Sequence, residues 1–177
     1  MRIIGGKYKS RRIPFSKKIK ARPTTDTAKE SLFNILENQL DLNDKEVLDL
    51  FSGTGNISYE FISRGAKQVT SVDQQLNSVK FINEQSKKWS MNIKTIKTNA
   101  FSFLEKETNK YDIIFADPPY DLKKAEEIPE IIFSKNIIKE NGILILEHDK
   151  NLNFHKSANF TEQRTYSSVN FSFFKND

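Results

Sequence analysis

Residues 46–56, with the sequence EVLDLFSGTGN, decide the fold of this 177-residue chain. The apolar run at 47–51 predicts a buried strand, Gly53-Thr54-Gly55 predicts a tight turn, and Asn56 predicts the start of a helix. A strand, a glycine turn and a helix in this order open a nucleotide-binding α/β unit. Glycines in such a turn let backbone N–H groups approach a ligand that a Cβ atom would push away.

Two further apolar runs also end in acidic residues. Asp73 follows the run at 68–72, and Asp117-Pro118-Pro119-Tyr120 follows the run at 113–116. The carboxyl ends of parallel strands meet at one edge of a sheet, where α/β proteins bind their ligands. We therefore expect the glycine turn, Asp73 and the Asp-Pro-Pro-Tyr loop to lie together at that edge.

The rest of the chain alternates between strand-like and helix-like patterns. The predicted strands are 47–51, 67–72, 93–98, 111–116 and 142–147; the predicted helices are 56–64, 75–89, 101–107 and 124–135; an antiparallel hairpin is predicted at 161–174. This alternation indicates an α/β fold whose mostly parallel sheet is covered on both faces.

One more helix is expected before the first strand of that series. It should be capped near Thr25 or Thr27, with Glu30 as the capping-box partner of Thr27, and should pack against an edge of the sheet.

Positive charge is concentrated at the beginning of the chain. Residues 1–22 contain nine Lys and Arg residues and no acid, whereas the remainder has 19 bases and 23 acids, a net charge of −4. We therefore divide the chain into a basic arm (1–22), predicted to form a β-hairpin, and a catalytic domain (23–177). In that hairpin Ile3, Ile4, Ile13 and Phe15 are expected to pack on the domain and present the bases outward. Such segregation is typical of a nucleic-acid-binding surface, with a solvated tail as the alternative.

Composition excludes several other classes of protein. The chain has no cysteine, so it has neither a disulfide framework nor a thiolate metal site. It begins without an apolar leader, and no long uncharged apolar run is present. We expect a soluble, cytoplasmic protein with no membrane partner and no metal.

Two cofactors compete for the glycine turn. A dinucleotide usually requires a third glycine, which is replaced here by Ser58, and the carboxylate of Asp49 would repel its pyrophosphate. Asp49 would instead suit the ammonium group of S-adenosylmethionine, although it could also bond the N–H groups of its own loop. Asp73 fits the ribose of either cofactor. We therefore favour S-adenosylmethionine.

The residues Asn99-Ala100-Phe101 follow the third predicted strand, whose end lies beside the adenine in this architecture. The Asn99 amide could pair with the adenine edge while Phe101 stacks on it. The alternative is that Asn99 caps the helix that follows.

The Asp117-Pro118-Pro119-Tyr120 loop is the most specific signal. Its prolines direct carbonyl groups into the site. Asp117 and the Pro118 carbonyl can accept hydrogen bonds from an exocyclic amine and point its lone pair at an electrophilic methyl group. Tyr120 offers a face on which a base can stack. The alternative is an ordinary loop with a tyrosine packed in the core.

These residues give the chain a family resemblance. The chain resembles the small bacterial methyltransferases that modify a guanine N2 in small-subunit ribosomal RNA. The resemblance covers residues 2–7 (RIIGGK), the stretch 22–26 (RPTTD) that leads into 30–36 (ESLFNIL), and the segments 49–55, 63–66 and 117–120. Asp73 stands where many of these relatives have glutamate.

The resemblance implies a Rossmann-like, class I methyltransferase fold with seven strands, the last of them antiparallel. It implies S-adenosylmethionine as the cofactor and ribosomal RNA, within an assembling small-subunit particle, as the partner.

Combining the motifs with the resemblance gives a set of site residues. The predicted catalytic residues are Asp117, Pro118 and Tyr120. The predicted cofactor-binding residues are Asp49, Phe51, Gly53, Thr54, Gly55, Asp73, Asn99, Ala100, Phe101 and Asp117. The predicted substrate-binding residues are Lys7, Lys9, Arg11, Arg12, Arg22, Thr24, Pro119 and Tyr120.

Other functions stay open at this point. An amino-methyltransferase acting on adenine N6 in DNA or RNA, or on a protein glutamine, would use the same loop, although DNA enzymes normally add a recognition region to flip the base. An NAD-dependent oxidoreductase is disfavoured by Asp49, Ser58 and the prolines. A non-catalytic RNA-binding module would leave the loop unexplained. His148 and His155 are expected to be surface or capping residues.

Overall fold

The computed structural model describes residues 1–19, 24–166 and 169–176. Its strands are β1 (Glu46–Leu50), β2 (Gln68–Asp73), β3 (Ile93–Lys97), β4 (Tyr111–Ala116), β5 (Ile138–His148), β6 (Phe160–Tyr166) and β7 (Val169–Lys175). Its helices are α1 (Asp26–Gln39), α2 (Asn56–Ser63), α3 (Leu76–Lys88), α4 (Ala100–Lys106), the 3-10 turn η1 (Ala125–Glu127) and α5 (Ile128–Ser134). Every predicted core element is present.

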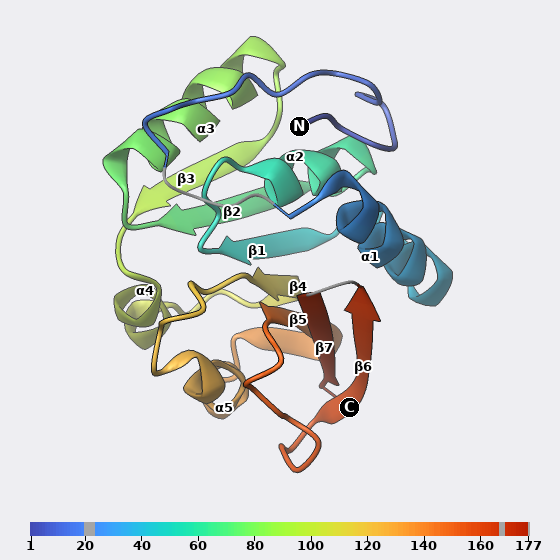
Figure 1. The fold of residues 1–177 in the computed structure, drawn as a ribbon, viewed down its shortest axis with the longest axis vertical. Helices are drawn as coiled ribbons and strands as arrows, with labels where there is room; N and C mark the ends of the chain where they lie inside the picture. Colours follow the sequence, from blue (N-terminus) through green and yellow to red (C-terminus); the bar gives the residue numbers. More distant parts are fainter. Residues whose placement is uncertain (20–23, 167–168, 177) are drawn as a thin grey trace.

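The strands form one seven-stranded sheet in the order β3-β2-β1-β4-β5-β7-β6 (Figure 1). Strands β1 to β5 are parallel, and β7 runs antiparallel to both β5 and β6. The chain reverses its direction of progress across the sheet between β1 and β4. Such a switch point opens a crevice at the carboxyl ends of the strands, where α/β proteins bind ligands.

Helices cover both faces of the sheet, as the sequence predicts. Alternate strand residues divide between two cores, because side chains along a strand point to opposite faces. Val47 of β1 and Phe115 of β4 pack with α1 and α2, whereas Leu48 and Ile114 of the same strands pack with α4 and α5. Helix α3 lies beside α2 and is covered by the N-terminal segment, which is the described part (1–19) of the basic arm (Figure 1).

Helix α1 differs from expectation at its start and in its position. Thr25 is the N-cap and its side chain accepts a hydrogen bond from the Ala28 N–H, so Thr27 and Glu30 do not form the predicted capping box. The buried face of α1 packs in the same core as residues of β1, β4, β5 and β7. It therefore covers the middle of the sheet instead of an edge.

Strand β5 begins four residues earlier than predicted. Ile138 pairs with Tyr111, and the register then shifts before Ile143 pairs with Ile113. Asn141, with a φ of 58°, and Gly142 form the irregularity. A Cβ at Gly142 would lie 2.7 Å from the Lys139 carbonyl oxygen, so this close turn of backbone requires glycine.

The N-terminal segment forms a hairpin-like turn with a single antiparallel bridge, between Arg2 and Arg12. Ile3 and Ile13 are buried against α2 and α3, as expected. Phe15 is 83% exposed, so its predicted packing on the domain is wrong. One bridged pair fixes the alternation of inward and outward side chains only near residues 2 and 12. It does not extend to Phe15.

Within residues 1–19, 24–166 and 169–176, no helix combines the length and apolar character needed to cross a lipid bilayer.

Candidate functional site

The glycine turn between β1 and α2 has an unusual backbone. Phe51, Gly53 and Gly55 have φ values of 62°, 52° and 77°. Glycine tolerates this region freely, but a bulky residue such as Phe51 adopts it at a cost of about 1–3 kcal/mol. Strain of this kind concentrates at ligand-binding sites, so Phe51 draws attention to the turn independently of its glycines.

Asp73, at the end of β2, lies against the glycine turn as predicted. Its Oδ2 accepts a hydrogen bond of 2.8 Å from the Gly53 N–H, and its Oδ1 accepts one of 2.7 Å from the Gln75 N–H. Burial raises the pKa of this carboxyl, and the two N–H donors oppose the shift. Asp73 therefore holds the turn in shape from the neighbouring strand.

Asp49 lies beneath the turn. Its side chain is 1% exposed and accepts a hydrogen bond from the Ser58 hydroxyl, which is also 2.6 Å from the Ser71 hydroxyl. Burial raises the pKa of Asp49 to about 7. Ser58, identified in the sequence only as a missing glycine, is thus the hydrogen-bond partner of Asp49.

Asn99 is the N-cap of α4. Its side-chain oxygen accepts hydrogen bonds from the N–H groups of Phe101 and Ser102, at 2.9 and 3.4 Å. The capping interpretation is therefore confirmed, and it commits the amide oxygen. Phe101 is partly buried and packs against the core beneath α4.

The Asp117-Pro118-Pro119-Tyr120 loop leaves the end of β4 beside β1, and the Asp117 N–H lies 3.4 Å from the Leu50 carbonyl oxygen. Pro118 is buried, whereas Pro119 is exposed and Tyr120 is 51% exposed. The alternative of a tyrosine packed in the core is therefore excluded. An exposed ring beside a partly buried carboxyl fits a loop that receives a base.

A second carboxyl, which the sequence interpretation missed, lies beside Asp117. Glu147, at the end of β5, is 3% exposed, and its Oε2 accepts a hydrogen bond of 2.8 Å from the Thr24 hydroxyl. Burial raises the pKa of Asp117 well above its ordinary value, and the Glu147 and Asp49 carboxyls raise it further. The only signal in the sequence is that residue 147 is the last residue of the predicted strand 142–147.

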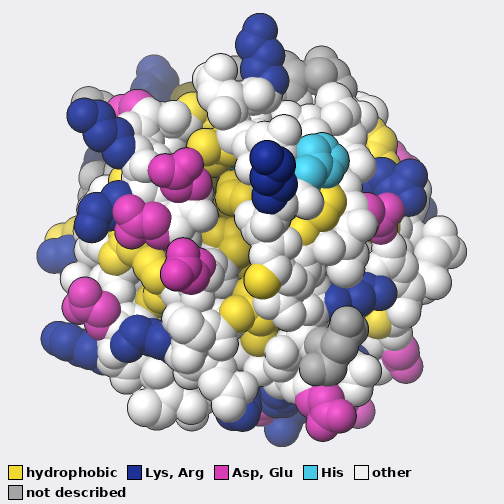
Figure 2. Space-filling model, turned by 90° about the horizontal axis from the view of Figure 1, so that it is seen from below, with side chains coloured by type: hydrophobic (Ala, Val, Ile, Leu, Met, Phe, Trp, Pro, Cys, Tyr) yellow, Lys and Arg dark blue, Asp and Glu magenta, His cyan; other side chains and the backbone are white. Residues whose placement is uncertain are grey.

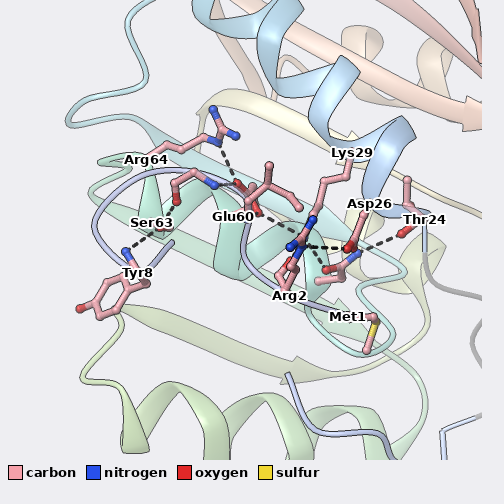
Figure 3. Close-up of polar contacts among 12 residues, drawn as sticks. Met1, Arg2, Tyr8, Thr24, Asp26, Lys29, Glu60, Ser63 and Arg64 are labelled. Atoms are coloured by element: carbon pink, nitrogen blue, oxygen red, sulfur yellow. Dashed lines mark hydrogen bonds and ion pairs between the residues drawn. The ribbon is translucent and has the colours of Figure 1, made fainter. Parts of the chain in front are cut away.

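A buried polar network joins this region to the N-terminal segment (Figure 3). The Lys29 ammonium, fully buried in α1, contacts Glu60 Oε2 of α2 at 3.1 Å and donates to Asn56 Oδ1 at 2.8 Å and to the Arg2 carbonyl at 2.7 Å. Asn56 in turn donates to the Thr24 carbonyl at 3.2 Å. Burial lowers the pKa of Lys29, while Glu60 opposes that shift.

The predicted substrate-binding bases lie on the N-terminal segment and have different surroundings. Lys7, Lys9, Arg11 and Arg12 are exposed. The Arg11 guanidinium lies 4.7 Å from the centre of the Tyr8 ring, in a cation–π contact, and 5.9 Å from that of Trp89. Arg22, and with it the 22/23 domain boundary, lies outside the described residues.

His148 is buried, so the prediction of a surface or capping residue is wrong for it. Its Nε2 is 2.8 Å from the Ser172 hydroxyl and its Nδ1 is 2.6 Å from the Asp149 carbonyl. Burial lowers its pKa. His155 is exposed, as expected.

Among the residues that the structure describes, no group of three or more His, Asp or Glu side chains is arranged to hold a metal ion.

Comparison with known proteins relates the whole chain to one family. A sequence model of the family described as "Conserved hypothetical protein 95" matches residues 1–175. The chain is 34% identical, over 154 residues, to the ribosomal RNA small subunit methyltransferase D of Buchnera aphidicola subsp. Baizongia pistaciae, covering 86% of this chain and 78% of that protein.

Solved structures agree on the fold. A hypothetical protein from Thermus thermophilus superposes with a TM-score of 0.86 at 20% identity, covering 98% of both chains. A 16S rRNA N2 methyltransferase from the same organism, in complex with AdoMet and guanosine, matches with a TM-score of 0.70 at 19% identity, over 90% of this chain and 45% of that one. At such identities these similarities establish the fold alone.

Proposed function

This chain belongs to the Conserved hypothetical protein 95 family, together with ribosomal RNA small subunit methyltransferase D, and from that premise we propose that it methylates small-subunit ribosomal RNA. The methyl donor is S-adenosylmethionine, and the acceptor is the exocyclic N2 amine of a guanine. The observation that carries the proposal is the Asp117-Pro118-Pro119-Tyr120 loop, held beside the glycine turn at the switch point of the sheet.

The charge of the site supports a cationic cofactor. Asp49, Asp117 and Glu147 are carboxyls at the ends of β1, β4 and β5, and burial raises the pKa of the first two. Buried carboxyls of this kind favour a positively charged ligand, because a cation restores their ionised forms. A pyrophosphate would meet the same groups with repulsion. S-adenosylmethionine carries both a sulfonium and an ammonium group, so its positive charges match these three carboxyls.

In the proposed reaction, side chains of this protein orient the guanine that accepts the methyl group. S-adenosylmethionine supplies an electrophilic methyl group on its sulfonium, so the reaction breaks an S–CH₃ bond and forms an N–CH₃ bond. Asp117 and the Pro118 carbonyl accept hydrogen bonds from the guanine N2 amine and align its lone pair, while Tyr120 stacks on the base. The amine proton passes to Asp117 or to water. Glu147 and Thr24 hold the Asp117 side of the site.

The direct test is methyl transfer from labelled S-adenosylmethionine to naked ribosomal RNA, to small-subunit particles and to DNA, followed by nucleoside analysis. We expect N2-methylguanosine from ribosomal RNA or its particles. N6-methyladenosine as the product would replace this proposal with an adenine methyltransferase, and RNA binding without any methylated nucleoside would indicate a non-catalytic module.

The cofactor assignment predicts the effect of changing Asp73. Asp73→Ala should weaken S-adenosylmethionine binding by about 1.5–3 kcal/mol, because a charged acceptor for the ribose hydroxyls is lost. The same change removes the acceptor of the Gly53 N–H and so loosens the turn.

Calorimetric titration measures this effect, and Asp73→Glu is the matched control because it retains a carboxylate. Unchanged cofactor affinity in folded Asp73→Ala protein would remove Asp73 from the site.

The exposed bases of the N-terminal segment lead us to expect a strong salt dependence of RNA binding. Each base that neutralises a phosphate changes the logarithmic slope of affinity against salt by about 0.7–0.9. Neutralising Lys7, Lys9, Arg11 and Arg12 together should therefore reduce that slope by about three.

An RNA-binding titration in rising salt measures the slope, and calorimetry should find cofactor affinity intact. Because Arg11 also packs on Tyr8, thermal unfolding must verify that the fourfold variant is folded. Superimposable slopes would mean that the RNA-binding surface lies elsewhere.

A further inference from the structure

An open hollow lies between the N-terminal segment and the start of α1. It has a volume of about 460 Å³ and is lined by Met1, Arg2, Ser10, Arg12 and Asp26. Of these residues, only Arg12 belongs to the substrate-binding set predicted from the sequence. Figure 3 shows the Met1, Arg2 and Asp26 side of the hollow, beside the buried Lys29 network.

The backbone brings the two arginines together. Arg2 and Arg12 are directly opposite one another in the antiparallel bridge, so their side chains lie on the same face of the hairpin. Their chain neighbours Ile3 and Ile13 point the other way and are buried at 0% and 3% exposure. Both arginine side chains therefore leave the hairpin on its exposed face, and both line the hollow.

The Arg2 wall of the hollow is fixed from inside the protein. The Lys29 ammonium donates to the Arg2 carbonyl at 2.7 Å, and the N–H groups of Ile4 and Gly5 donate to the buried Glu60 carboxylate at 2.9 and 2.8 Å. The Arg2 side chain is further oriented by Asp26, whose Oδ2 is 3.3 Å from the Arg2 Nε. This order is paid for on folding, so a ligand meets a preformed surface.

The hollow adjoins the cofactor turn, and the start of α1 connects it to Glu147 beside the acceptor loop. The Met1 sulfur is 3.5 Å from the Thr54 hydroxyl of the glycine turn. Asp26 is two residues from Thr24, whose hydroxyl donates to Glu147 beside Asp117. The hollow thus lies on the side of the protein from which these contacts lead to the cofactor turn and to Glu147, so a bound nucleic-acid strand could extend a phosphate toward it.

We propose that this hollow is a phosphate subsite for the RNA strand that delivers the target base, with Arg2 and Arg12 binding one phosphodiester and Ser10 contributing a hydroxyl donor. The inference rests on the proposed function and extends it to Arg2, Ser10 and Asp26. Arginine is suited to this role because its planar donors match phosphate geometry. Asp26 limits the positive charge of the hollow, because its carboxylate pairs with Arg2. The opposite end of the molecule, viewed in Figure 2, carries acidic and basic side chains intermixed.

Binding of a fluorescent single-stranded RNA dodecamer tests the subsite. The double variant Arg2→Gln/Arg12→Gln should bind about 10- to 100-fold more weakly at low salt, and its logarithmic salt slope should fall by about 1.4, at about 0.7 for each single-strand contact. Asp26→Asn should have the opposite effect and tighten RNA binding several-fold. Cofactor affinity should be unchanged in each variant.

Two controls match these variants in charge. Lys110→Gln/Lys156→Gln removes two exposed positive charges elsewhere, and Glu130→Gln removes one exposed negative charge on α5. Both should leave the affinity nearly unchanged. If the lysine control weakened binding as much as the arginine variant, or if the arginine variant bound with wild-type slope, the subsite would be wrong. Methyl transfer to ribosomal RNA by the wild-type protein is measured in parallel. If the wild type methylates the RNA, a failed subsite test overturns only the subsite and not the proposed function.

Discussion

Replacing Asp117 by alanine should leave a folded protein that binds S-adenosylmethionine and transfers methyl about 10²–10³-fold more slowly, the range found when one preorganised hydrogen-bond group is removed from a reaction site. The carboxyl lies at the end of β4, where its N–H is 3.4 Å from the Leu50 carbonyl oxygen. In the proposed mechanism the Asp117 carboxyl orients the amine that accepts the methyl group. The loss should therefore appear mainly in the single-turnover rate, with a smaller loss of cofactor affinity because one of the three carboxyls that favour a cation is removed.

Three variants separate this role from a general disturbance of the loop. Asp121→Ala changes an exposed acid one residue beyond Tyr120 and should retain the wild-type rate. Tyr120→Ala should lose most turnover, whereas Tyr120→Phe should be milder because the stacking face survives. Wild-type single-turnover rates in both Asp117→Ala and Tyr120→Ala would show that the chemistry assigned to this loop is wrong.

Local patterns were enough to predict the sheet and its helices. Strands β1, β2 and β4 are buried runs that end in a glycine turn or an acid, and these ends meet at one edge because parallel strands share a direction. The same patterns do not report how elements pack. The position of α1 over the middle of the sheet, and the early start of β5, depend on residues distant in sequence, such as the Tyr111 partner of Ile138.

The residues of the candidate site also divide into those that the sequence predicts and those that only the structure shows. Asp73 and Asp117 could be found because each ends a recognisable strand. Glu147, Lys29 and Glu60 could not be found in this way. Their contacts with Thr24, Asn56 and Gly5 span 123, 27 and 55 positions of the chain. A lysine or glutamate on a helix ordinarily faces water, and only tertiary structure shows that this pair is fully buried.

Asp49 should give the unfolding free energy an unusual dependence on pH. The folded protein keeps a proton on this carboxyl up to a pKa of about 7, whereas the ordinary value is 3.8. The folded state therefore binds more protons than the unfolded state between these values. The contribution of Asp49 to stability is fully present below about pH 4 and is lost as the pH rises to about 7, a total of about 4 kcal/mol.

Chemical denaturation of wild type and Asp49→Asn from pH 4 to pH 8 measures this contribution as a difference. Because other carboxyls in the protein titrate in both variants, only the difference between the two curves reports Asp49. We expect wild type to lose stability relative to Asp49→Asn across that interval. Parallel curves would mean that Asp49 is already ionised in the folded protein.

The same proton decides whether Asp49 binds the ammonium group of the cofactor. A cation placed beside the carboxylate lowers its pKa, so binding of S-adenosylmethionine at pH 6 to 7 should release a proton, and affinity should rise with pH through that range. Calorimetric titrations in two buffers of different ionisation enthalpy count the protons released. Asp49→Asn should abolish that part of the release. If wild type and variant release equal numbers of protons, the carboxyl serves only Ser58 and the turn above it, and the ammonium group binds elsewhere.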